Sequence, residues 1–455
     1  MGSRVPKFEY TWAWSKDRRG SLRQEAVLIR PHCDCFFIRR FDMTAIMRFV
    51  VFSLLVVASL AERVRYDGYQ TLRIEPRDEH QRSVIHRLIE TQEDKLDFWV
   101  PSLNKPADVM VAPRYQSWLK HLLDEAGIEY SVMIEDVQAL IDYERDMDRA
   151  SATFSYNNYN TYEQMCAWMD DMVAYSSYVT KFRIATSGKD QEQIYALKVS
   201  SGGTGKKVVY MQGGLHAREW ISPATVIYMT KLLLDLDTLE GYLEEFDFII
   251  VPLLNVDGYK YSWDVDRMWR KTRSELEGSS QVGVDGNRNY PYKWGGAGAS
   301  TSPRSDTYRG PNPLSEPEVL HTTEYLSQLG NVAVFIDVHS YSQLWLSPWS
   351  YIADSSDDLV DHQAAGELAS KALAKRYGTQ YTVGPSAETL YAASGVSVDW
   401  AHETLGAKYA VTIELRDKGG LFGYGFLLPE EQIEPSGLET FDGFMAYIDY
   451  AIDHP

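Results

Sequence analysis

The chain of 455 residues is 44% hydrophobic and 24% charged, so it can build a large apolar core and more than one domain. Its formal net charge of -19 argues against a nucleic-acid partner, because phosphates require a basic surface. Only three cysteines are present, so the core must provide the stability that disulfides give to small secreted domains.

An apolar run near the start of the chain is typical of a secretory signal. Phe49–Leu60 follows an arginine, precedes small residues and is too short for a membrane span. Because signals begin near the N-terminus, we expect translation to start at Met43 or Met47. Residues 1–46 are then a gene-prediction extension or an atypical leader, and 47–61 the signal peptide, with a signal anchor as the alternative. We expect a secreted, extracellular protein without stable membrane association.

Residues 62–149 show a short alternation of strand and helix patterns, which predicts a small α/β sandwich. A charged stretch at the end of this segment, Asp142–Arg149, is typical of an exposed linker. Arg149 is the expected cleavage site for a trypsin-like protease, with Arg145 as the alternative. The expected strands and helices are, in chain order, Tyr69–Ile74, His80–Glu90, Leu96–Val100, Pro113–Glu125 and Tyr130–Ile134.

Residues 150–455 have a different pattern, in which long apolar runs alternate with helical segments. Near-continuous apolar strands that alternate with helices predict a mixed, largely parallel sheet covered by helices on both faces. The apolar runs are Val208–Met211, Phe248–Leu254, Val332–Val338 and Tyr409–Leu415. The helical segments are Ala224–Leu236, Glu316–Leu329 and His362–Tyr377.

Chemically versatile side chains lie at the ends of three of these strands. His216 and Glu219 follow the first run, His339 follows the third, and Glu414 lies in the last. Ligands of open α/β sheets bind beyond the carboxyl ends of the strands, so we expect these side chains at one edge. His216, Glu219 and His339 make a catalytic zinc set, because three protein ligands leave a fourth position for water. Zinc activates that water and polarises a carbonyl, and Glu414 remains as the general base.

Other candidate motifs have simpler explanations. A lone histidine is more often a satisfied polar residue than a ligand, and we assign that role to His321 in its helix. His402-Glu403 begins an H-E-x-x-H pattern, but Gly406 occupies the position of the second histidine. No G-x-S-x-G motif is present, and Cys166 has no signature of a catalytic thiol.

Two arginine-rich segments follow apolar strands, Trp269–Arg273 and Gly283–Asn289. Arginine is the residue best suited to bind a carboxylate through two parallel hydrogen bonds. An enzyme that recognises a free C-terminus needs such a group. Taken alone, however, these arginines are more simply explained as solvated loop charges.

Together, these segments resemble the digestive metallocarboxypeptidases of the A/B type across residues 62–455. The resemblance implies an activation domain at 62–149 that covers the active site, and a catalytic domain at 150–455. It also implies one Zn²⁺, peptide or protein C-termini as substrates and activation by a trypsin-like protease; we expect a monomer. The matching blocks are, in the family's order, G-L-H-A-R-E-W, R-M-W-R-K-T-R, G-V-D-G-N-R-N, H-S-Y-S-Q-L, Y-A-A-S-G and T-I-E-L-R-D.

The resemblance gives the strand-end residues the same roles as above, three zinc ligands and a general base. Arg270 matches the residue that stabilises the oxyanion. Asn287 and Arg288 match the pair that binds the terminal carboxylate of the substrate, and Tyr391 closes over it. Two further residues belong to the substrate-binding set by resemblance, Arg218 as an outer-subsite contact and Tyr341.

The preferred terminal side chain depends on Val398, which the resemblance places at the base of the specificity pocket. Members that prefer Lys or Arg carry an acidic residue there, because a buried cation needs a partner. A mainly apolar pocket predicts a preference for aromatic and branched aliphatic residues, and Ser350 and Ser386 leave the choice between these open. The other expected lining residues are Leu346, Leu390, Ala393 and Thr412.

Two departures from the family pattern are visible, and neither removes a catalytic group. Gln281 and Arg304 occupy positions where many relatives have a disulfide, and Lys418–Tyr424 is longer than usual, which we expect to reshape the rim of the site. Two rival functions remain. A zinc amidase on the same fold would not need the activation domain, and a noncatalytic binding protein should have lost Glu414 or a metal ligand.

Overall fold

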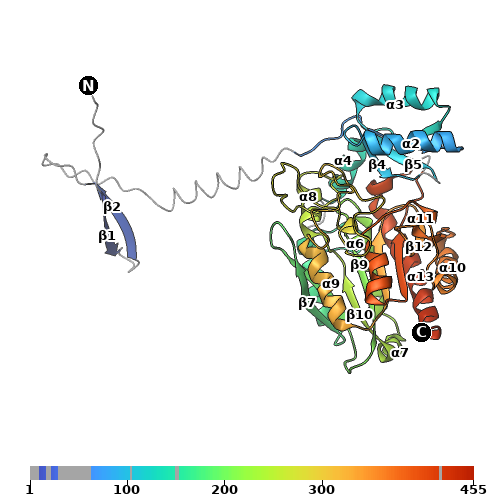
Figure 1. Ribbon diagram of the computed structural model, residues 1–455. Helices are drawn as coiled ribbons and strands as arrows, with labels where there is room; N and C mark the ends of the chain where they lie inside the picture. Colours follow the sequence, from blue (N-terminus) through green and yellow to red (C-terminus); the bar gives the residue numbers. More distant parts are fainter. Residues whose placement is uncertain (1–9, 17–21, 29–62, 103–104, 149–152, 420–422) are drawn as a thin grey trace, which may run out of the picture. The chain divides into compact units, whose positions relative to one another are not determined.

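The computed structural model describes residues 10–16, 22–28, 63–102, 105–148, 153–419 and 423–455 (Figure 1). The predicted signal peptide and the predicted cleavage site Arg149 lie outside these residues. Residues Met1–Glu62 and Arg63–Pro455 form two separate compact units. The first contains an antiparallel pair of strands, β1 (Tyr10–Lys16) and β2 (Leu22–Leu28). No described helix is both long and apolar enough to cross a membrane.

Residues 63–148 form a small domain with a four-stranded antiparallel sheet of order β4-β5-β3-β6. Its core lies between the sheet and the helices α2 and α3, where Leu72, Ile85, Val109 and Leu119 are buried. The predicted α/β sandwich is confirmed, although β5 was not predicted. The elements are β3 (Gln70–Glu75), α2 (Glu79–Thr91), β4 (Leu96–Val100), β5 (Ala107–Val111), α3 (Pro113–Glu125), β6 (Glu129–Ile134) and α4 (Val137–Asp148).

The helix α4 corrects the prediction of an exposed linker at Asp142–Arg149, because the chain is helical as far as Asp148. Val137 and Ile141 are buried, and Glu144 follows on the same face of the helix. Glu144 is buried as well, since it forms an ion pair with Arg267 of the large domain. This charged segment therefore belongs to an amphipathic helix. The buried face of the helix includes one carboxylate, Glu144, which is paired with Arg267.

Residues 153–455 form the large domain around an eight-stranded mixed sheet of order β13-β12-β14-β11-β9-β10-β8-β7. The strands β10, β9, β11 and β14 run parallel, and β7, β8 and β12 are antiparallel to a neighbour. The strands are β7 (Val179–Thr186), β8 (Gln193–Val199), β9 (Lys207–Gly213), β10 (Phe246–Val251), β11 (Val332–His339), β12 (Leu344–Ser347), β13 (Thr382–Pro385) and β14 (Tyr409–Glu414). The main helices are α5 (Tyr162–Tyr175), α6 (Ile221–Leu234), α7 (Leu239–Glu245), α8 (Val256–Asp264), α9 (Pro317–Leu329), α10 (Leu359–Tyr377), α11 (Ser386–Thr389), α12 (Ser397–Trp400) and α13 (Ile433–Asp453).

Helices cover both faces of this sheet, as predicted. On β7, the Phe182 ring packs against Tyr325 of α9, whereas the Lys181 ammonium donates to the Cys166 carbonyl of α5. Because successive strand residues point to opposite faces, α9 and α5 lie on opposite sides. The helices α6, α13 and α10 pack on one another in one layer (Figure 1). The parallel central strands therefore read as continuous apolar runs because both of their faces are buried.

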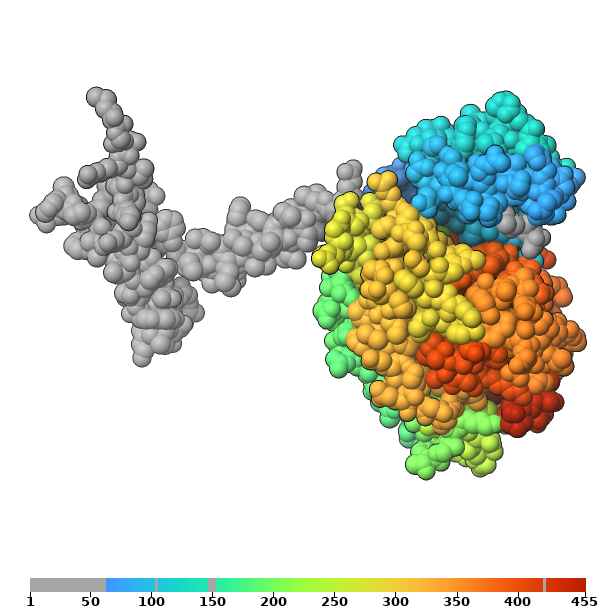
Figure 2. All heavy atoms as spheres, viewed as in Figure 1, coloured from blue at the N-terminus to red at the C-terminus, as the bar shows by residue number. Residues whose placement is uncertain are grey.

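The two domains share a third apolar core. Trp99, Met110 and Ile134 of the small domain are buried together with Met268 and Phe426 of the large domain. Figure 2 shows the blue and cyan atoms of the small domain seated on the body of the large one. The small domain is thus docked by apolar burial as well as by ion pairs.

The central strand β11 gives a stability test. Val334→Ala removes two buried methyl groups from a residue with no exposed surface and should lower the free energy of unfolding by about 2 kcal/mol. The matched control Val360→Ala changes a side chain that is 81% exposed. It should change the free energy of unfolding by less than about 0.5 kcal/mol. Denaturant unfolding measures both, and equal effects would contradict the described core.

Candidate active site

The three predicted ligands meet at the carboxyl ends of β9 and β11. His216 Nδ1 lies 2.8 Å from Glu219 Oε1, and His339 Nδ1 lies 3.0 Å from Glu219 Oε2. The two Nδ1 atoms are 3.1 Å apart, and all three side chains are buried. Among the described residues, this is the one group of three or more His, Cys, Asp or Glu side chains whose ligand atoms lie within 4.8 Å of one another.

The turn after β9 brings two of these ligands together. Gly214 has a left-handed backbone with φ of 62°, and a Cβ there would lie 2.4 Å from the Leu253 side chain, so glycine is required. The Ser222 hydroxyl accepts from the Gly214 amide and donates to the Val338 carbonyl at 2.5 Å. Ser222 therefore joins the loop that carries His216 to the strand end that carries His339.

Two buried carboxylates orient the histidines. His216 Nε2 lies 3.0 Å from Asp285 Oδ1, and His339 Nε2 lies 3.1 Å from Asp337 Oδ2. With Nε2 of each ring held by a carboxylate, the Nδ1 atoms face each other and Glu219. Metal-binding histidines commonly have such a partner, which fixes the tautomer and strengthens the ligand. The donor set and its surroundings therefore fit zinc, with two imidazoles and one carboxylate.

Arg270 lies beside this cluster and contacts two of its carboxylates. Its Nη2 donates to Asp285 Oδ2 at 2.9 Å, and its Nη1 lies 3.7 Å from Glu219 Oε1. Burial opposes ionisation of Asp285, but the charges of Arg270 and His216 outweigh it and hold the pKa of that carboxyl well below its usual range. A cation is thus already fixed beside the metal ligands.

Glu414 ends β14, where it is paired in register with His339 of β11. Its side chain is partly exposed, unlike the buried ligands. Desolvation raises the pKa of Glu414 to about 8, and the nearby charge of Glu219 acts in the same direction. A carboxyl group with a raised pKa therefore lies at the edge of the predicted metal centre.

The residues expected to bind a terminal carboxylate lie together. Arg288 Nε donates to the Gly298 carbonyl at 2.7 Å, and its Nη2 lies 3.4 Å from the Tyr391 hydroxyl. Asn287 Oδ1 accepts from the Ser397 amide, and its Nδ2 lies 3.5 Å from His339 Nε2. The expected carboxylate-binding residues therefore adjoin the predicted metal ligands, through the contact of Asn287 with His339.

The expected specificity residues come from three segments. Leu346 of β12 and Thr412 of β14 are direct neighbours across antiparallel strands. Val398 of α12 is buried, and the next residue, Asp399, directs its carboxylate to the amides of Ser350 and Tyr351. The acid beside Val398 is therefore already engaged with backbone. The Ala393 amide donates to the Ser350 carbonyl, which links this segment to the same group.

The small domain covers the residues next to the metal centre. Asp97 Oδ2 lies 3.1 Å from Arg218 Nη1, and the Tyr341 hydroxyl donates to Asp108 Oδ2 at 2.8 Å. The Trp99 ring packs edge-on against Tyr341, with ring centroids 6.5 Å apart. Two predicted substrate-binding residues, Arg218 and Tyr341, are therefore occupied by side chains of the small domain.

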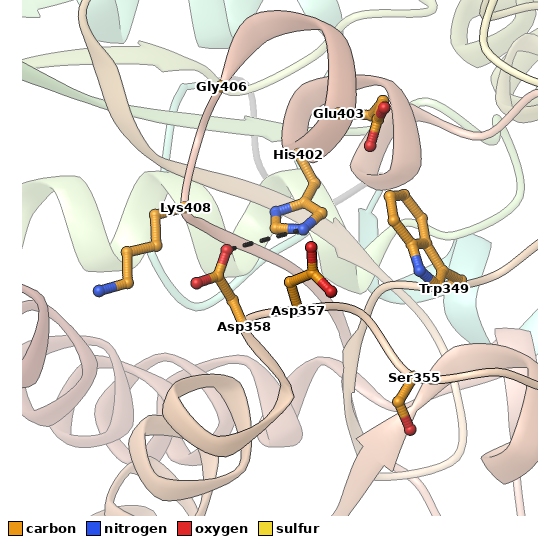
Figure 3. A pocket seen from close by; sticks show the side chains of 8 residues that line it. All are labelled: Trp349, Ser355, Asp357, Asp358, His402, Glu403, Gly406 and Lys408. Atoms are coloured by element: carbon orange, nitrogen blue, oxygen red, sulfur yellow. Dashed lines mark ion pairs between the residues drawn. The ribbon is translucent and has the colours of Figure 1, made fainter.

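A cavity of about 440 Å³ lies elsewhere, around His402 and Glu403 (Figure 3). His402 Nε2 approaches Asp358 at 3.9 Å, and its ring packs against Trp349 and His362. None of the three metal ligands lines this cavity. The cavity therefore lies apart from the three predicted metal ligands.

Comparisons with known proteins identify the class. Residues 165–443 match the zinc carboxypeptidase family, and residues 72–144 match the carboxypeptidase activation peptide. Carboxypeptidase A2 of Mus musculus is 39% identical over 401 residues, which cover 85% of this chain and 95% of that protein. Carboxypeptidase A5 of Homo sapiens is 36% identical over 422 residues, with 89% and 95% covered.

Solved structures agree. Thrombin activatable fibrinolysis inhibitor is 33% identical, with a TM-score of 0.75, and the match covers 85% of this chain and all of that one. Carboxypeptidase A from Helicoverpa armigera is 27% identical, with a TM-score of 0.77 and 85% and 98% covered. The chain belongs to the zinc carboxypeptidase family. It is a metallocarboxypeptidase zymogen with an activation peptide, and zinc is its metal.

Several residues of the site were missed from sequence. Asp337 lies two positions before His339 on the same strand, so the period of two could have placed both on one face. Asp285 lies in the G-V-D-G-N-R-N segment, but only its Asn and Arg were considered. Arg267 begins the R-M-W-R-K-T-R block but was given no role, and Phe426 was not singled out, because their contacts depend on the small domain docked against them.

The carboxylates behind the histidines give a metal-binding test. Asp337→Asn keeps the shape of the side chain but removes the charge that orients His339, so zinc affinity should fall about 10- to 100-fold. Competition with a coloured chelator measures this affinity. The control Asp453→Asn changes an exposed acid near the C-terminus and should leave it unchanged. Equal affinity in both variants would contradict the proposed role of Asp337.

Proposed function

We propose that this chain is the secreted precursor of a carboxypeptidase that releases aromatic or branched aliphatic C-terminal residues. Trypsin-like cleavage at Arg149 would release the small domain. The observation that carries the proposal is the arrangement of Glu414 and Arg270 around the buried His216, Glu219 and His339, beside the Arg288 group. Hydrolysis at a free chain end requires a metal site, groups that assist the reaction and a binding site for the terminal carboxylate, all next to one another.

Substrate binding would begin at the terminal carboxylate. Arg288 presents a planar guanidinium suited to bidentate binding, and Asn287 adds an amide donor. Tyr391 is partly exposed and lies within reach of Arg288, so it can close over a bound carboxylate. This anchor sets which peptide bond lies next to the metal centre, and therefore favours release of a single residue.

A zinc ion held by the three ligands would polarise the substrate carbonyl and lower the pKa of a bound water. Glu414 would accept the proton of the attacking water and deliver it to the leaving amine. A positive ion nearby favours the carboxylate form, which offsets the raised pKa of Glu414 and leaves it able to accept a proton. Arg270 would donate to the oxygen that becomes negative, from a position already fixed by Asp285.

Autoinhibition explains why a small domain is present. It occupies Arg218 and Tyr341 through Asp97 and Asp108, so a peptide cannot reach the same side chains. A zinc amidase for small derivatives would not need such a cover. The contacts therefore favour a peptidase precursor over the amidase alternative.

Activation of the purified precursor tests the proposal. Trypsin should produce an activity that releases Phe or Leu from peptide C-termini and is abolished by a zinc chelator. Glu414→Gln should lower kcat about 10²- to 10⁴-fold after activation, because the proton acceptor is lost. Glu388→Gln changes an exposed glutamate and serves as the control. No release of any residue after clean cleavage would refute the peptidase proposal.

The specificity pocket gives a separate test. Val398→Asp introduces a buried carboxylate that a cationic side chain can neutralise, so preference should move from Phe and Leu toward Lys and Arg. The ratio of kcat/KM between matched peptides ending in Phe and Lys measures the change. Val360→Asp alters an exposed valine and should leave the ratio as it was. An unchanged ratio in Val398→Asp would show that Val398 does not contact the released side chain.

A further inference from the structure

We infer that Glu316, the residue at which helix α9 begins, is a positioning residue for the reaction, because it fixes both segments that carry the arginines of the site. The inference rests on the proposed function, in which Arg270 stabilises the oxyanion and Arg288 binds the terminal carboxylate. Glu316 belongs to neither segment, so it would act through both of them.

The carboxylate of Glu316 is buried, with 1% of the residue exposed. Its Oε2 accepts from the Thr272 hydroxyl at 2.6 Å and from the Ser274 hydroxyl, and its Oε1 accepts from the Ser315 hydroxyl at 3.0 Å. Thr272 and Ser274 are 44 and 42 residues away along the chain. A buried carboxylate is costly unless hydrogen bonds compensate it, so these hydroxyls make its burial possible and fix its position.

Thr272 passes this attachment to the Arg270 side of the site. The Thr272 hydroxyl also accepts from the Val284 amide at 2.9 Å, and the Thr272 amide donates to the Val284 carbonyl at 2.9 Å. The next residue, Asp285, holds the Arg270 guanidinium at 2.9 Å, and Arg270 itself lies two residues before Thr272. Glu316 therefore fixes the base of this loop, next to Arg270 and its carboxylate partner.

The start of α9 also holds the chain beyond Arg288. The Glu316 amide donates to Asn289 Oδ1 at 3.1 Å, and Asn289 follows Arg288 directly. Asn289 Nδ2 donates to Ser315 Oγ at 3.0 Å, and the Leu314 amide donates to the Asn289 carbonyl at 2.8 Å. Asn289 is buried, so these bonds are shielded from water. Arg288 is therefore fixed on its C-terminal side by the residues that lead into the helix.

One buried residue thus joins two segments that must be placed together. The separation of Arg270 and Arg288 sets which carbonyl lies beside Arg270 when the terminal carboxylate is bound. A displacement of about 1 Å in such groups can lower a rate about 100-fold. Loss of Glu316 should therefore impair both turnover and carboxylate recognition. Lower stability alone does not have this effect, because kcat and KM per folded molecule do not depend on the free energy of unfolding.

Kinetics of the activated enzyme test this role. Glu316→Ala should lower kcat/KM for a peptide ending in Phe about 100-fold, through a lower kcat and a higher KM. Carboxylate recognition is measured separately with two inhibitors. 3-Phenylpropionate has the ring and the carboxylate of a terminal Phe, and 3-phenylpropanamide lacks the charge. The preference for the acid over the amide should fall about tenfold, because Arg288 is no longer aligned. Rates are expressed per folded, zinc-loaded molecule.

Three further variants separate positioning from folding. Thr272→Val removes one of the hydroxyls that bind Glu316 with little change in shape, and should lower kcat about tenfold. Glu316→Gln keeps one acceptor oxygen and should retain more activity than Glu316→Ala. The control Glu318→Gln changes an equally buried carboxylate in the same helix, which accepts from the Gly188 amide instead. It should leave kcat and the carboxylate preference unchanged.

The outcomes separate the inference from the proposed function. An unchanged kcat and an unchanged carboxylate preference in Glu316→Ala would overturn the inference and leave the proposed function intact. If that variant does not fold, an unchanged kcat in Thr272→Val overturns it equally. Equal losses in Glu318→Gln would overturn the assignment to Glu316. No release of Phe by the natural enzyme would overturn the proposed function, and the inference with it.

Discussion

The site depends on the burial of three carboxylates, Glu219, Asp285 and Asp337, around two histidines. Buried anions are stable only when cations or hydrogen-bond donors compensate them. Arg270 supplies one fixed positive charge, and a zinc ion on the ligand set supplies the rest. Apolar burial of the parallel strands brings these groups to one edge, where a bound zinc ion would add positive charge beside the carboxylates.

The same rule explains how the precursor is kept closed. Arg218 and Arg267 of the large domain are buried, and the small domain gives each of them a carboxylate, Asp97 and Glu144. Arg218 also pairs with Asp306 of its own domain. The apolar core around Trp99 and Phe426 adds binding energy that does not depend on charge. The activation peptide is therefore held to the large domain by paired charges as well as by apolar burial.

Much of the fold could be read from the chain. Apolar runs such as Val332–Val338 predicted buried parallel strands, because a strand covered on both faces is apolar throughout. Each of these predicted runs contains a strand in the structure. The failure at Asp142–Asp148 has a physical reason. An inward glutamate looks like a solvated charge in sequence, and only its partner, 123 residues away, shows that it is buried.

The sequence by itself identified the family and predicted the metal-ligand set that the structure brings together, because strand-end placement and ordered motifs constrain residue type locally. It could also have placed Asp337, which shares a strand face with His339. Only the tertiary structure decided which carboxylates orient the histidines, which acid faces which arginine, and that Arg267 depends on Glu144 for its charge partner. These pairings join residues far apart in the chain, and nothing in local periodicity encodes a long-range ion pair.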